Sequence, residues 1–226
     1  MPTQATSTAE NYAKALYQLQ QKQTDNSPVS LGQLADQLGV TPGTATTMVK
    51  RFADDGLVRY TPRKGARLTP GGMKLALAVL RRHRIIETFL VEVLGLDWAE
   101  VHEEAEVLEH AVSEKVLDKL DALLGHPTAD PHGSPIPPAP GAGPMRMIEM
   151  RPLTDCRPGQ RVTVSRLLDT LPRFLQFAER NGLTPGAAVR VIANDPAADA
   201  ITVKVGRAAP TTLGSAAAGK VLVTGE

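Results

Sequence analysis

Two histidines and two glutamates recur on one face of a predicted helix in the middle of the chain. His102, Glu106, Glu109 and His110 stand at relative positions 0, 4, 7 and 8. At about 100° per residue these side chains fall within a sector of about 100°. A separate apolar stripe runs beside them: Val101, Ala105, Leu108 and Val112. The helix therefore presents a packing face and, next to it, a face of imidazoles and carboxylates, which are costly to bury unless they are paired or bound to a metal.

The preceding predicted helix adds His83 and Glu87, which are four residues apart and therefore share a face. Together the six residues offer nitrogen and oxygen donors without sulfur, a set that suits Mn²⁺ or Fe²⁺. The chain has one cysteine, Cys156, which excludes a multi-thiolate zinc site and an internal disulfide. The competing interpretation is an exposed glutamate-rich helix with incidental histidines. Three histidines and three glutamates in register on adjacent helices favour the metal.

A second constellation, between residues 31 and 69, predicts DNA binding. Two predicted helices, 31–38 and 43–55, are separated by Gly39-Val40, and Thr41-Pro42 supplies an N-cap and a first-turn proline for the second. Two short predicted strands, 57–60 and 66–69, enclose a basic turn. This is the element order of a winged helix-turn-helix, whose second helix enters the major groove.

The first turns of that second helix carry small, mostly hydroxylic residues that allow close approach to bases. The predicted DNA contacts there are Thr41, Gly43, Thr44, Thr46 and Thr47. Their hydroxyls suit phosphates or base edges, and their methyl groups suit thymine methyls. Long bidentate base readers are absent from these turns, so specificity is expected to depend on DNA shape as well. The predicted phosphate contacts are Lys50, Arg51, Arg59, Arg63, Lys64 and Arg67.

The charge distribution agrees with both constellations. The net charge is +1, but residues 50–84 hold ten Lys/Arg and two Asp, whereas residues 85–121 hold eleven Asp/Glu and two Lys. A basic block suits phosphates, and the acidic block beside it suits cations. The sequence shows neither a signal peptide nor an apolar stretch long enough to span a bilayer, so a cytoplasmic protein without membrane contact is expected.

The chain divides at a proline-rich segment, residues 127–144, which contains seven Pro and three Gly. We expect it to be a semi-extended linker. Before it the pattern is helical, with further predicted helices at 10–21, 70–94 and 98–124. After it, predicted strands at 161–165, 189–193, 201–205 and 220–224, with a short helix at 172–181, indicate a small barrel.

The chain resembles the diphtheria toxin repressor family of iron- and manganese-dependent regulators. The residues that carry the resemblance lie at 9–12, 41–51, 55–58, 82–87, 95–97, 101–105, 108–110 and 133–137, the last being a Gly-x-Pro-Ile-Pro signature. The resemblance implies a mainly α protein with a small β domain. Its expected parts are a winged-helix DNA-binding domain (1–72), a helical dimerisation and metal-binding domain (73–126), a Pro-rich linker (127–148) and an SH3-like barrel (149–226).

The resemblance also implies two neighbouring metal sites. The ancillary-type site would use His83, Glu87 and His102, and the primary site would use Glu106, Glu109 and His110 together with Asn11 of the first helix. Glu106 stands where iron-responsive members have Cys and manganese-responsive members have Glu. Mn²⁺ is therefore the expected cofactor, with Fe²⁺ as the alternative.

The sequence thus predicts a homodimeric, metal-activated repressor of manganese or iron homeostasis genes that binds double-stranded operator DNA and is not an enzyme. A carboxylate-metal enzyme is the first rival, but the paired Glu-x-x-His motifs of di-iron bundles are absent, as are phosphate-loop and Gly-x-Ser-x-Gly motifs. The other rivals are a metal-independent winged-helix DNA-binding protein and a helix-mediated adaptor. Titrating metal in a DNA-binding assay separates them.

Overall fold

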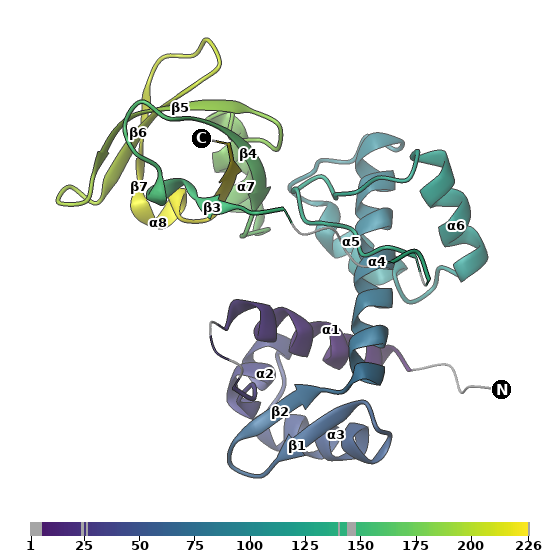
Figure 1. Ribbon diagram of the computed structural model, residues 1–226. Coiled ribbons are helices and arrows are strands. Elements are labelled where there is room, and N and C mark those ends of the chain that lie inside the picture. The colour runs from purple at the N-terminus through teal and green to yellow at the C-terminus, as the bar shows by residue number, and fades with distance from the viewer. Residues whose placement is uncertain (1–5, 24, 26, 140, 144–147, 226) are drawn as a thin grey trace. The chain divides into compact units, whose positions relative to one another are not determined.

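The computed structural model describes residues 6–23, 25, 27–139, 141–143 and 148–225. The start of the predicted DNA-binding domain, parts of the predicted linker and the last residue lie outside these ranges. The chain forms two compact units, one of residues 1–82 with 139–141 and one of residues 83–138 with 142–226. Figure 1 shows the order of their helices and strands. Among the described residues, none of the helices is both long enough and apolar enough to cross a membrane.

The first unit contains the predicted winged helix-turn-helix. Its elements are α1 (Ser7–Lys22), α2 (Leu31–Leu38), α3 (Pro42–Asp54), β1 (Val58–Thr61), β2 (Gly65–Leu68) and the first half of α4 (Pro70–Glu92). The helix starts follow from capping residues: Ser30 forms a capping box with Gln33, and Thr41 accepts a hydrogen bond from the Thr44 amide. Gly39 ends α2 in the left-handed conformation, with a φ of 63°.

The wing is the antiparallel pair β1–β2, in which Arg59 lies opposite Arg67. Val29 adds an isolated bridge to Ala66, and their backbones exchange two hydrogen bonds of 2.9 Å. Gly65 allows this close approach, since a Cβ atom there would collide with the Val29 carbonyl, and its φ is +124°. The wing is therefore anchored to the strand-like residue before α2.

The core of the first unit lies between the helices and the wing. Leu16, Leu34 and Val49 are fully buried there, and Tyr12 meets Phe52 edge to face at 5.3 Å between ring centroids. These residues come from α1, α2 and α3, so their packing fixes α3 against the other two helices. The opposite face of α3 is exposed.

The second unit begins with the remainder of α4 and continues with α5 (Val101–Leu108) and α6 (Glu114–Leu123). The prediction of one helix over 98–124 is therefore wrong. Residues 109–113 interrupt it, and Ser113 caps a new helix by accepting a hydrogen bond from the Val116 amide. The predicted ligands Glu109 and His110 are the first two residues of this break. The predicted helix 70–94 is confirmed in type but ends at Glu92.

The proline-rich segment has no regular helix or strand in its described part, as predicted. Its first half is nevertheless packed into the second unit, which the sequence did not indicate. Asp130, His132 and Ser134 are buried, and Ile136 packs with Ile85 of α4 and Leu117 of α6. The position of the linker between domains stays a prediction.

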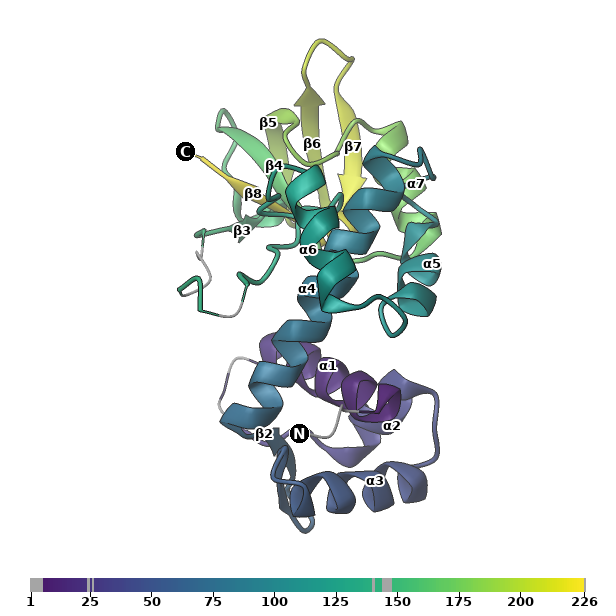
Figure 2. The same ribbon diagram turned by 90° about the vertical axis from the view of Figure 1, so that its right-hand side faces the viewer.

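The C-terminal sheet is antiparallel, with strands in the order β3-β8-β4-β5-β6-β7. The strands are β3 (Arg151–Pro152), β4 (Arg161–Leu167), β5 (Ala188–Asp195), β6 (Ala200–Val205), β7 (Thr211–Gly214) and β8 (Val221–Thr224). Buried and exposed residues alternate at the start of β4, where Val162 and Val164 are buried and Arg161 and Thr163 are exposed. Figures 1 and 2 show helix α7 (Pro172–Arg180) in the C-terminal part of the chain with these strands. Phe174 and Leu175 of this helix are buried in the same core as the strands.

The four predicted strands and the predicted helix are all present. Strands β3 and β7, the 3₁₀ turn η1 (Leu153–Asp155) and the short helix α8 (Ser215–Ala218) were not predicted. β7 contributes one buried apolar residue, Leu213, so its sequence carries little alternation to detect.

Candidate metal centre

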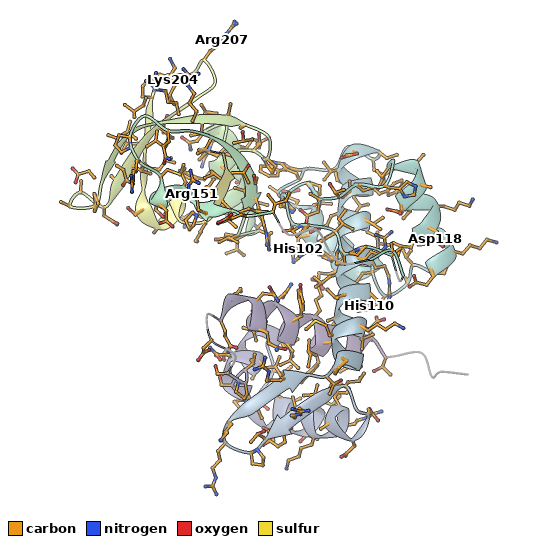
Figure 3. All side chains as sticks on the ribbon, viewed as in Figure 1. His102, His110, Asp118, Arg151, Lys204 and Arg207 are labelled. Atoms are coloured by element: carbon orange, nitrogen blue, oxygen red, sulfur yellow. The ribbon has the colours of Figure 1, made fainter. Side chains whose placement is uncertain are left out.

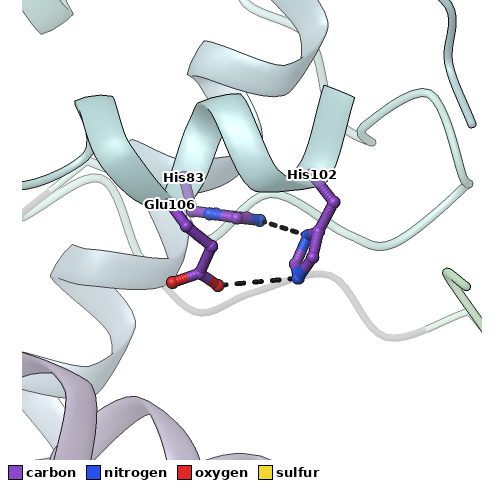
Figure 4. A group of neighbouring side chains, drawn as sticks. All are labelled: His83, His102 and Glu106. Carbon is purple, nitrogen blue, oxygen red and sulfur yellow. Dashed lines mark hydrogen bonds and ion pairs between the residues drawn. The ribbon is translucent and has the colours of Figure 1, made fainter. Parts of the chain in front are cut away.

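Helices α4 and α5 bring the predicted ligands of the second unit together. His83 and Glu87 lie one turn apart on α4, and His102 and Glu106 lie one turn apart on α5. Figure 4 shows His83, His102 and Glu106 pointing toward one another. Each of these three residues offers a ligand atom, and the three atoms lie within 4.8 Å of one another. Figure 3 places His102 and His110 among the side chains of the same unit.

Among His83, Glu87, His102 and Glu106, the shortest contacts join the imidazoles to each other and to Glu87. His83 Nε2 lies 3.0 Å from His102 Nδ1 and 3.0 Å from Glu87 Oε1. His102 Nδ1 lies 3.0 Å from the same Glu87 oxygen, and His102 Nε2 lies 3.5 Å from Glu106 Oε1. His83 and Glu87 are buried, whereas His102 and Glu106 are partly exposed. The group therefore reaches from the interior to the surface.

Glu109 and His110 join the same group through the other side of His83. Glu109 Oε2 lies 2.6 Å from His83 Nδ1, and Glu109 Oε1 lies 3.5 Å from His110 Nε2. The Glu109 side chain is fully buried. All six predicted ligands of this unit therefore form one continuous set of contacts. His83 contacts members of both predicted sites, and their division into two sites stays a prediction.

Asn11, the seventh predicted ligand, lies on α1 in the first unit and is partly buried. Its role as a ligand stays a prediction from the resemblance.

The electrostatics of Glu87 show why this group holds together. Burial by itself raises the pKa of Glu87, but the electrostatic effect of His83 and hydrogen bonds with His102 and His83 lower the pKa well below its usual range. Glu87 is therefore a carboxylate at neutral pH despite its burial. A buried carboxylate surrounded by imidazoles is a suitable ligand for a divalent cation.

A second group was missed by the sequence analysis. Glu87, Asp130 and His132 are all buried, and each offers a ligand atom within 4.8 Å of the others. Burial, followed by the negative charge of Glu87, raises the pKa of Asp130, while the charge of Arg84 opposes that increase. The only signal in the sequence was an Asp and a His inside a proline-rich segment, and this segment was interpreted as a linker.

The predicted DNA-contacting residues lie on α3 and the wing in the first unit. Thr41, Gly43, Thr44 and Thr47 are exposed and Thr46 is partly exposed. The Thr46 hydroxyl donates a hydrogen bond of 2.7 Å to the Pro42 carbonyl, and the Thr47 hydroxyl donates one of 3.1 Å to the Gly43 carbonyl. These hydroxyls already have partners within the helix. The Thr methyl groups are then the parts left for apolar contact with bases.

The basic side chains proposed for phosphate contact are also on the surface. Lys50, Arg51, Arg59, Arg63 and Lys64 are exposed and Arg67 is partly exposed. Arg63, at the tip of the wing, has a φ of 63°. The left-handed conformation closes the tight turn between β1 and β2.

Comparison with protein families assigns all three parts of the chain. Residues 4–66 match the iron dependent repressor, N-terminal DNA binding domain, and residues 69–138 match the iron dependent repressor, metal binding and dimerisation domain. Residues 151–225 match the FeoA domain. These matches agree with the predicted fold class, in which a winged helix and a helical metal domain precede an SH3-like barrel.

Comparison with individual proteins and solved structures also finds metal-dependent repressors. The iron-dependent repressor IdeR of Mycobacterium tuberculosis is 34% identical over 195 residues, which are 81% of this chain and 83% of that protein. The diphtheria toxin repressor of Corynebacterium efficiens is 37% identical over 131 residues, which are 58% of this chain and 55% of that protein. A solved manganese-dependent transcriptional repressor in complex with manganese is 40% identical, with a TM-score of 0.85 over 95% of this chain and 98% of the other. This chain belongs to the iron-dependent repressor family and is a metal-dependent, DNA-binding transcriptional repressor that dimerises.

Proposed function

We propose that Mn²⁺ is the activating metal of this repressor, with Fe²⁺ as the alternative. The observation that carries the proposal is the Glu106 carboxylate, 3.5 Å from His102 Nε2 at the surface end of a donor group that contains no sulfur. A thiolate at this position would favour softer ions, whereas a carboxylate supplies an oxygen donor that Mn²⁺ tolerates well. The manganese-dependent repressor that this chain resembles at 40% identity supports the same choice.

The geometry of the donors fits a divalent cation. His83 Nε2, His102 Nδ1 and Glu87 Oε1 are separated pairwise by 3.0 Å. Neighbouring ligand atoms that lie about 2.1 Å from a common ion at right angles are about 3 Å apart. The shortest contacts favour His83, Glu87 and His102 as one group of ligands, with Glu106 beside His102. Glu109 and His110 form the other group. Asn11 is proposed only from the resemblance.

When bound, the cation supplies positive charge to a group in which Glu87 and Glu109 are buried carboxylates. His83, which contacts both carboxylates, holds the two groups of ligands in one arrangement. The metal is an effector in this proposal and takes part in no catalytic step. It favours the conformation that completes its coordination, and DNA that selects the same conformation tightens metal binding equally.

The DNA-binding part of the proposal assigns α3 to the major groove and the wing to the phosphate backbone. The residues proposed to contact bases are Thr41, Gly43, Thr44, Thr46 and Thr47. The residues proposed to contact phosphates are Lys50, Arg51, Arg63 and Lys64. The proposed domains are residues 1–72, 73–126 and 149–226, with 127–148 between the last two. The exposure of these side chains in the first unit supports the assignment.

The experiment is operator binding by the full chain against Mn²⁺, Fe²⁺, Co²⁺, Zn²⁺ and no metal under anaerobic conditions. The operator is selected from a random DNA library in the presence of Mn²⁺. Glu106→Cys should lose the Mn²⁺ response and retain or gain the response to the softer ions. Glu103→Cys, which changes an exposed glutamate of the same helix, should keep the original profile. An unchanged profile in Glu106→Cys would remove the main support for manganese.

A further inference from the structure

The C-terminal barrel carries a row of basic side chains across three neighbouring strands. Arg161 of β4 lies opposite Arg190 of β5, and Arg190 lies opposite Lys204 of β6. We call these three residues the basic row. Val189 and Val203, the sequence neighbours of Arg190 and Lys204, are buried in the barrel core. Since side chains alternate along a strand, the basic row lies on the outer face of the sheet.

The basic row has no acidic partner within the described part of the chain, because no ion pair joins it to a carboxylate. Like charges directly opposite each other on adjacent strands are destabilising. The acidic residue of β5, Asp195, is five positions from Arg190, which is about 16 Å in an extended strand and beyond the Debye length at physiological salt. The basic row therefore costs the free barrel stability, and a role in folding does not explain it.

Arg207 adds a fourth positive charge beside the basic row. It is exposed in the turn between β6 and β7. The turn is held against β5, since the Gly206 amide donates a hydrogen bond of 3.1 Å to the Ala188 carbonyl. Figure 3 shows the side chains of Lys204 and Arg207 extending outward from the same end of the barrel. Four positive charges therefore gather on one part of the barrel surface.

The side chains around the basic row favour phosphates over an acidic protein as the partner. Thr163 of β4 and Thr202 of β6 each lie two positions from a member of the row and share its face. Arginine, lysine and threonine side chains all bind DNA phosphates. A protein interface needs an apolar centre. Of the described large apolar residues in β4, β5 and β6, Ile192 alone is exposed, at 41%, which is too little to form one.

We propose that the basic row and Arg207 bind the phosphate backbone of DNA, as a second contact in addition to the winged helix. The chain is a DNA-binding repressor, so DNA held by α3 and the wing is available to the tethered barrel at a high effective concentration. Phosphate contacts read no bases, and the barrel therefore adds affinity without adding sequence preference. This inference goes beyond the proposed function and does not depend on which cation activates the protein.

The test measures DNA binding by the full chain with fluorescence anisotropy at several salt concentrations. The probe is a labelled duplex that extends about two helical turns beyond the selected operator on each side, and the metal is the ion that gives the tightest operator binding. Arg190→Gln, which removes the central charge of the basic row, should weaken binding and reduce the slope of log affinity against log salt concentration by about 0.9. Arg173→Gln removes an exposed charge of α7 and should leave affinity and slope unchanged.

Equal affinity and slope for Arg190→Gln and the unchanged protein overturn the proposal, and an acidic protein surface then becomes the partner to test. Urea unfolding checks the fold of the variant, which should unfold at no lower urea concentration because a like-charge pair is removed.

A second measurement uses the unchanged protein and is independent of how the variant folds. Lys204 should react less with acetic anhydride when the duplex is bound, as measured by mass spectrometry. Lys220, which pairs with Asp169 on another part of the barrel, should react equally with and without DNA. Acetylation of Lys204 that DNA does not reduce also overturns the proposal.

Discussion

His83 Nδ1 lies 2.6 Å from Glu109 Oε2, in a contact where both side chains are almost completely buried. The opposite nitrogen of the same ring contacts Glu87 and His102. His83 therefore links the ligands on α4 and α5 to Glu109, the residue that directly follows the end of α5. The two groups of metal ligands should behave as one coupled unit rather than as independent sites.

We expect His83→Ala and Glu109→Ala to be strongly non-additive in their effects on Mn²⁺ affinity. Once either partner is lost, removing the other costs less, and residues in direct contact show interaction energies of about 0.5–3 kcal/mol. The measurement is a double-mutant cycle with Mn²⁺ titrations. Pairing His83→Ala with Asp118→Asn, an exposed residue of α6, should give additivity within about 0.5 kcal/mol. Additivity of His83→Ala with Glu109→Ala would contradict the coupling.

Most of the fold could be predicted because its signals are local. Thr41-Pro42 marks the start of α3 through capping and proline geometry, and the spacing of His102 and Glu106 places both on one helical face. The interruption after Leu108 was missed because the acidic and apolar pattern continues through it. The meeting of His132 with Glu87 was missed because it depends on tertiary packing across 45 sequence positions, which no periodicity reveals.

The recognition helix gives a prediction about which part of Thr47 contacts DNA. The Thr47 hydroxyl donates a hydrogen bond to the Gly43 carbonyl, so the methyl group is the part left for thymine methyls. Thr47→Ser, which removes only that methyl, should weaken operator binding about fourfold, the value of one buried methyl group. Thr47→Val, which retains it, should bind nearly as well as the unchanged protein. Operator affinities are measured by fluorescence anisotropy. If Thr47→Ser bound the operator more tightly than Thr47→Val, the hydroxyl would be the group that contacts DNA.

The wing gives a prediction that is independent of DNA sequence. Lys64 is exposed beside the wing tip, where a lysine contributes to phosphate binding but reads no base. Lys64→Ala should weaken binding to operator and to unrelated DNA by similar factors. It should also reduce the slope of log affinity against log salt concentration by about 0.9, since one fewer phosphate is neutralised. Loss of affinity for the operator alone would contradict this role.

Asp130 gives a prediction about the metal-free protein. Burial and the charge of Glu87 raise the pKa of Asp130 above its ordinary value of 3.8, despite the opposing charge of Arg84. A carboxyl group whose pKa is raised by folding costs no stability below pH 3.8, and costs increasingly more as the pH rises through its folded pKa. Asp130→Asn should therefore stabilise the metal-free protein at neutral pH, and this advantage should shrink as the pH falls toward 3.8. Denaturant unfolding in EDTA from pH 4 to 7 measures the difference.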